Sequence, residues 1–197
     1  MLALSTRDQY RTLLDADTLT ASDAAAPAII YVSSTASPVT VSRRQFREQT
    51  RRYATALAQM NIRPGDLVII AHTQNLESIY AFWGAMLLGA VPSMFPTLTE
   101  KLDPAIYMQN MSELVKFSGV RCILTTDDFA PTLAAKVPCP VYGSKTLLAS
   151  LDKTKTQPIY NPNYTPAPDS VAFLQHSSGT TGLQKGVALS HRAVLNQ

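Results

Sequence analysis

Apolar residues along this chain alternate between short continuous runs and longer stretches with helical spacing. Residues 43–60 are predicted to form a helix that Ser42 begins, because apolar residues recur there every three to seven positions. These residues are Phe46, Tyr53, Leu57 and Met60. The run Leu67–Ala71 is continuously apolar, which is typical of a strand buried on both faces of a parallel sheet.

The same alternation continues through most of the chain. Further helices are predicted over residues 76–88, from Asp103 onward and from Asp127 onward. Further strands are predicted over residues 91–95, 121–125, 140–142, 171–175 and 187–190. Strands that alternate with helices indicate βαβ units, so the expected fold class is α/β, with a mainly parallel sheet and flanking helices.

The pattern lapses between residues 152 and 169, where four prolines lie in a polar stretch: Pro158, Pro162, Pro166 and Pro168. We interpret this stretch as an extended connection between two lobes. The predicted organisation is an N-terminal α/β lobe over residues 1–151, the proline-rich connection over 152–169, and the start of a second lobe over 170–197.

Composition excludes several classes of protein. A net charge of +3 is too weak to indicate a nucleic-acid partner, and the arginines after Ser42 are interpreted as a solvated helix face. Residues 78–99 carry no charge, but Pro92 and Pro96 favour a buried helix, a turn and a strand over a membrane span. The two cysteines, Cys122 and Cys139, lack metal-ligand spacing and predict reduced thiols in a cytoplasmic protein.

The segment His176–Gly186 has the composition of a phosphate-binding loop. It holds glycines, hydroxyl residues and one lysine but no acid, and its candidate ligand-binding residues are Ser177, Ser178, Gly179, Thr180, Thr181, Gly182, Lys185 and Gly186. Glycines let backbone N–H groups converge on an anion. Hydroxyls donate hydrogen bonds without adding negative charge, and a lysine supplies a mobile cation.

This segment differs from the phosphate loop of common nucleotide hydrolases. That pattern places four residues between two glycines, then Lys and a hydroxyl residue before a helix. Here Gly179 and Gly182 are too close, Lys185 precedes Gly186, and residues 187–190 read as a strand. The loop is therefore predicted to join two strands of a hairpin, and a glycine-rich turn without a ligand remains the alternative at this point.

The loop and two upstream segments resemble the adenylate-forming superfamily, which includes acyl-CoA synthetases, fatty acyl-AMP ligases, peptide-synthetase adenylation domains and luciferases. The matching segments are residues 177–191, residues 39–69 with their Arg-Pro-Gly-Asp turn, and residues 84–92 with the sequence GAMLLGAVP. Order and spacing agree from about Ala28 to the end. The chain departs from the family pattern at Gln184, where proline is usual, and at Gln175 or His176, where an aromatic residue is common.

The resemblance implies that the parent enzyme joins a carboxylic acid to the α-phosphate of ATP, with Mg²⁺ screening the phosphates, and forms acyl-AMP and pyrophosphate. The acyl group would pass to coenzyme A or to the phosphopantetheine of an acyl carrier protein. Residues 177–186 would grip the β- and γ-phosphates without acting as the chemical catalyst. A fatty acid is the expected substrate, with an amino or aryl acid as the alternative.

The adenine-binding, metal-binding and ribose-binding residues of such enzymes, and their C-terminal domain with its activating lysine, have no counterpart in this sequence. The chain is therefore expected to be a truncated piece that is inactive by itself. A non-catalytic α/β module that binds nucleotide or a partner is the alternative function. His176 is expected to be a packing or positioning residue, because the three histidines are scattered without metal-ligand spacing.

Overall fold

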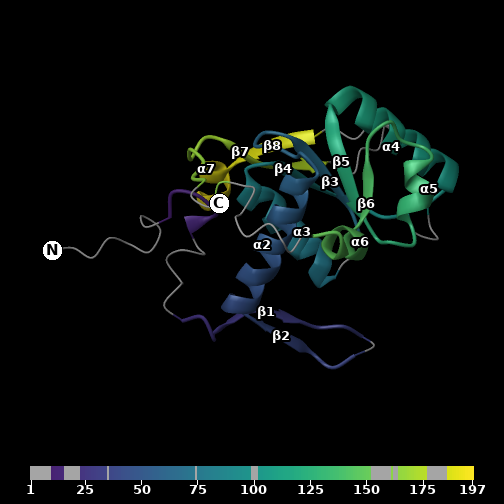
Figure 1. Ribbon diagram of the computed structural model, residues 1–197. Coiled ribbons are helices and arrows are strands. Elements are labelled where there is room, and N and C mark those ends of the chain that lie inside the picture. The colour runs from purple at the N-terminus through teal and green to yellow at the C-terminus, as the bar shows by residue number, and fades with distance from the viewer. Residues whose placement is uncertain are drawn as a thin grey trace.

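The computed structural model describes residues 10–15, 23–34, 36–73, 75–98, 102–151, 161, 164–176 and 186–197. Figure 1 shows a central sheet with helices on both sides and a separate hairpin at the bottom of the view. The strands are β1 (Pro27–Tyr31), β2 (Val39–Ser42), β3 (Leu67–Ala71), β4 (Val91–Phe95), β5 (Val120–Thr125), β6 (Val141–Gly143), β7 (Val171–His176) and β8 (Gly186–Ser190). The helices are α2 (Arg43–Gln59), α3 (Leu76–Leu88), α4 (Pro104–Ser118), α5 (Ala130–Ala134), α6 (Ser144–Ala149) and α7 (His191–Leu195).

Within the described residues, six strands form one sheet in the order β6-β5-β3-β4-β7-β8. All neighbouring pairs are parallel except β7 and β8, which are antiparallel. The remaining strands, β1 and β2, form an antiparallel pair of their own. This arrangement confirms the predicted α/β class and its mainly parallel sheet.

The helix boundaries follow from local capping chemistry. Ser42 begins α2 with a capping box: its hydroxyl accepts a hydrogen bond from the Gln45 backbone N–H, and the Gln45 side chain accepts one from the Ser42 N–H. Asp103 caps α4, and Pro104 takes the first helical position, where no N–H is needed. Gly89 ends α3 with φ of 88°, a left-handed conformation that glycine adopts at little cost.

Each face of the sheet carries its own core. Val68 and Ile70 of β3 point to the side covered by α2 and α3, whereas Leu67 and Ile69 point to the side covered by α4. Alternate residues of one strand therefore serve two different cores, which explains why β3 is apolar at every position and entirely buried.

Helices α2 and α3 pack closely against each other at Gly84. A Cβ atom at this glycine would lie 2.5 Å from Cβ of Tyr53 and 2.8 Å from the backbone oxygen of Thr50. The absence of a side chain at residue 84 thus sets the spacing between the two helices on this face of the sheet.

Several predicted boundaries differ from the observed ones, most of them by one residue. The helix expected from Asp127 begins at Ala130, because residues 127–129 form a turn. The Asp127 carboxylate instead accepts hydrogen bonds from the backbone N–H groups of Lys145 and Thr146, in the first turn of α6. The strand expected over residues 140–142 lies one residue further along, as β6.

The division into lobes stays a prediction. Residues 152–160, within the predicted connection, lie outside the described part of the chain. Beyond it, β7 pairs with β4 and so belongs to the same sheet as the strands of the first lobe. No helix among the described residues has the length and apolar character needed to cross a bilayer.

Candidate functional site

Strands β7 and β8 carry the predicted phosphate loop between them. Ser177, Ser178, Gly179, Thr180, Thr181, Gly182 and Lys185 lie outside the described residues, as does Gln184. The residues at both ends of the loop are described, and they form a register pair, His176 opposite Gly186. Gly186, the described member of the predicted set, is exposed at the start of β8. The prediction that this segment joins two paired strands is therefore confirmed, and the ligand-binding role of its residues stays a prediction.

Strand pairing places the end of β7, where the predicted loop begins, at the carboxyl edge of the sheet. β7 runs parallel to β4, with Ser93 opposite Leu174 and Met94 opposite Gln175. The end of β7 at His176 therefore lies beside the end of β4 at Phe95. Ligands of open parallel sheets bind outside the carboxyl ends of the strands, so this edge is where a nucleotide is expected.

His176 is half-buried at the root of the loop. Its Nδ1 lies 2.8 Å from Oγ of Ser93, and its ring packs edge-on against Phe95 with 5.7 Å between ring centroids. Burial lowers the pKa of this imidazole below its ordinary value. These contacts agree with the interpretation of His176 as a packing or positioning residue.

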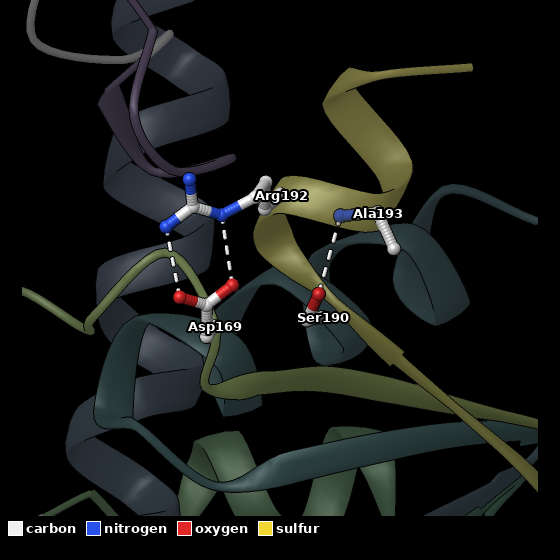
Figure 2. Close-up of polar contacts among 4 residues, drawn as sticks. All are labelled: Asp169, Ser190, Arg192 and Ala193. Carbon is white, nitrogen blue, oxygen red and sulfur yellow. Dashed lines mark hydrogen bonds and ion pairs between the residues drawn. The ribbon is translucent and has the colours of Figure 1, made fainter.

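The other end of the hairpin is held by groups that sequence analysis did not identify. The hydroxyl of Ser190 caps α7 by accepting from the Ala193 N–H, and the Arg192 guanidinium donates twice to the Asp169 carboxylate, at 2.8 Å each (Figure 2). The backbone N–H of Arg192 also donates to the carbonyl of Pro168. Together these contacts tie the end of β8 to the segment that leads into β7.

The N-terminal segment reaches the same place. The backbone N–H of Leu13 donates to Nδ1 of His191 at 3.2 Å, and His191 is only 2% exposed. Burial lowers the pKa of His191, and the nearby Asp15 carboxylate opposes this shift. No local pattern in the sequence indicated a contact between residues so far apart in the chain.

The composition of the segment between β7 and β8 suits an anionic ligand. No Asp or Glu occurs from His176 to Gly186, and Gly186 leaves the backbone open to close approach. Among the described residues, no group of three or more His, Cys, Asp or Glu side chains is arranged to hold a metal ion. We therefore assign none of these described residues to Mg²⁺.

Comparison with protein families shows to which family this chain belongs. The model of the AMP-binding enzyme family matches residues 19–197. The chain belongs to the AMP-binding enzyme family. Atromentin synthetase of Tapinella panuoides is 28% identical over 169 residues, which are 84% of this chain and 17% of that protein.

Solved structures share the fold of this member of the AMP-binding enzyme family. The fatty acyl-adenylate ligase of L. pneumophila, in complex with acyl adenylate and pyrophosphate, has a TM-score of 0.78 and 22% identity. That similarity covers 98% of this chain and 33% of the ligase. The adenylation domain of a keto acid-selecting NRPS module, bound to a keto acyl adenylate, has a TM-score of 0.76 and 24% identity, over 98% of this chain and 34% of that one. The chain thus spans about one third of these structures and corresponds to their N-terminal part.

Proposed function

We propose that this chain is the N-terminal part of an ATP-dependent carboxylic-acid ligase that forms acyl-AMP and pyrophosphate. The observation that carries the proposal is the β7–β8 pair, which flanks an acid-free segment of glycine, hydroxyl and lysine residues. Membership of the AMP-binding enzyme family supports the same activity.

In the proposed reaction the loop acts on the departing pyrophosphate. Serine and threonine hydroxyls and backbone N–H groups of residues 177–186 would donate hydrogen bonds to the β- and γ-phosphate oxygens, and Lys185 would offset their charge. Such donors stabilise the negative charge that accumulates on a leaving phosphate group. ATP and Mg²⁺ supply the phosphates and their screening, and coenzyme A or a carrier-protein phosphopantetheine would accept the acyl group.

A fatty acid is the proposed substrate. The sequence of Pro92–Pro96, followed by that of Lys101–Pro104, resembles fatty-acid-activating members of the family. The L. pneumophila neighbour is named as a fatty acyl-adenylate ligase. Acid-dependent ATP–pyrophosphate exchange with a panel of fatty, keto, amino and aryl acids tests this choice. Faster exchange with an amino or aryl acid than with any fatty acid would contradict it.

The activity is tested in the whole protein that contains this chain. We expect Lys185→Ala to slow acid-dependent ATP–pyrophosphate exchange by about tenfold or more, because a charge-assisted contact to phosphate is worth roughly 1.5–3 kcal/mol. The matched control is Lys136→Ala, which removes an exposed lysine far from the loop in the sequence and should leave exchange unchanged. Equal effects of the two variants would contradict the role of the loop.

The 197-residue chain by itself is expected to give no exchange, since the adenine- and acid-binding groups of the proposed enzyme have no counterpart in its sequence. Titration calorimetry with ATP and Mg²⁺ measures whether the isolated 197-residue chain binds nucleotide. Acid-dependent exchange by the isolated chain would show that the groups needed for adenylation are already present in it.

A further inference from the structure

A buried serine lies beneath the root of the predicted phosphate loop. Ser93, in the middle of β4, is completely buried, and its Oγ has two polar contacts. One joins it to the backbone oxygen of Leu174 at 3.0 Å, and the other joins it to Nδ1 of His176 at 2.8 Å. A polar side chain in this position links β4 to two residues of β7 at once.

The number of hydrogens on Ser93 and His176 determines which group donates in each of these two hydrogen bonds. A serine hydroxyl has one hydrogen to donate, and a carbonyl oxygen can only accept. Both contacts are hydrogen bonds only if Ser93 donates to the Leu174 carbonyl and the imidazole donates from Nδ1 to Ser93. His176 then carries a proton on Nδ1, and in its neutral form Nε2 holds a lone pair. The burial that lowers its pKa favours the same neutral form.

The imidazole also reaches the strand on the other side of the loop. A Cβ atom built on Gly186, its register partner on β8, would lie 3.4 Å from Nε2 of His176. The ring meets Phe95 of β4 edge-on. His176 therefore contacts β4 through Ser93 and Phe95 and faces β8 at Gly186, where the lack of a side chain leaves room for it.

We propose that His176, held as its Nδ1–H tautomer by Ser93, is a positioning residue that fixes the two ends of the phosphate loop relative to β4. This inference rests on the proposed function of the loop. A loop that binds phosphate through backbone N–H groups gains affinity when its ends are fixed before the ligand arrives, because less freedom is lost on binding.

The first test needs no substitution. Nitrogen-15 NMR of the imidazoles in the full chain distinguishes a ring protonated at Nδ1 from one protonated at Nε2. We expect the Nδ1–H pattern for His176 at pH 7.5, and its loss in Ser93→Ala. An Nε2–H tautomer in the unsubstituted chain would overturn the proposal, because Ser93 could not then accept from the ring.

Two substitutions at residue 176 separate hydrogen bonding from packing. The amide nitrogen of asparagine can take the place of Nδ1, so His176→Asn should keep the bond to Ser93, whereas His176→Phe keeps a ring without a donor. Calorimetry with magnesium pyrophosphate should show affinity within about threefold of the unsubstituted chain for His176→Asn. We expect about tenfold weaker binding for His176→Phe and Ser93→Ala, as for the loss of one buried hydrogen bond.

Amide hydrogen exchange in β7 and β8 provides a readout that does not depend on phosphate. It should quicken in Ser93→Ala and His176→Phe but not in His176→Asn. If the unsubstituted chain shows the tautomer and this exchange pattern but binds no pyrophosphate, the phosphate-holding function fails while the positioning role stands. Unchanged exchange in both Ser93→Ala and His176→Phe would overturn the positioning role itself.

Discussion

Replacement of Gly84 by alanine tests the packing of α2 against α3. Helix propensity alone predicts that Gly84→Ala in the interior of α3 stabilises the chain by about 1 kcal/mol. The structure predicts the opposite sign. The new Cβ would lie 2.5 Å from Cβ of Tyr53 and 2.8 Å from the Thr50 backbone oxygen, both closer than van der Waals contact allows.

The magnitude follows from what can move. Neither contact atom is the end of a flexible side chain, so the methyl group can be accommodated only if the two helices separate. Overpacking of this kind costs about 1–3 kcal/mol, and a clash with backbone belongs near the upper end of that range. After the gain in helix propensity is subtracted, Gly84→Ala should lower the free energy of unfolding by about 2 kcal/mol.

Urea unfolding of the full chain, followed by circular dichroism, measures this loss as a lower midpoint at an unchanged slope. Gly119→Ala is the matched control: its Cβ would meet nothing within 4 Å, and its φ of 63° adds only the cost of a left-handed alanine, roughly 1–2 kcal/mol. Near-ultraviolet spectra should change for Gly84→Ala and not for the control. A Gly84→Ala chain as stable as the original would refute the inferred spacing of the helices.

Three further predictions concern charge and thiol chemistry. Asp127→Ala should lower the unfolding free energy by about 1 kcal/mol, measured by urea unfolding, because α6 loses the acceptor for its first N–H groups. Folding lowers the pKa of His191 below its unfolded value of 6.5, so the free energy of unfolding should fall as the pH drops through 6.5. Urea midpoints measured from pH 7.5 to 5.5 should show this fall, and it should be smaller in His191→Gln. Burial raises the pKa of the Cys139 thiol to about 11, and it raises the pKa of the fully buried Cys122 thiol further. Labelling of the folded chain by iodoacetamide at pH 7.5, followed by mass spectrometry, should therefore be slow at Cys139 and undetectable at Cys122.

Elements with strong local signals were predictable from the sequence. The bounds of α3, β3 and β4 agree with the predicted ranges, because largely apolar segments are ended by residues that act locally, such as the left-handed Gly89. The short helix α6 was missed for the opposite reason. Its first N–H groups donate to Asp127, which lies 18 and 19 residues earlier. No residue adjacent to α6 in the sequence therefore indicates where the helix begins. The same aspartate suggested a helix start at the wrong place, because Asp is also a favoured N-cap.

The phosphate-binding composition of the loop could be recognised in the sequence, but the groups that contact its two ends could not be predicted. Ser93 and His176 are 83 residues apart, and they meet only because β7 inserts beside β4 rather than beside β6. Likewise, Leu13 and His191 are 178 residues apart. Periodicity describes one strand or helix at a time, so it contains no information on strand order, and contacts that depend on strand order cannot be derived from it.

Strand order also indicates where the rest of a nucleotide site would lie. The chain leaves β3 toward α3 on one face of the sheet and leaves the adjacent β4 toward α4 on the other face. Connections that part in this way open a crevice at the carboxyl ends of the two strands, and ligands of α/β sheets bind in such crevices. His72 follows β3 at this point; it is 5% exposed, and its Nε2 has no hydrogen-bond partner among the described residues. Since β7 lies directly beside β4, its carboxyl end, where the predicted phosphate loop begins, is one strand away from this crevice.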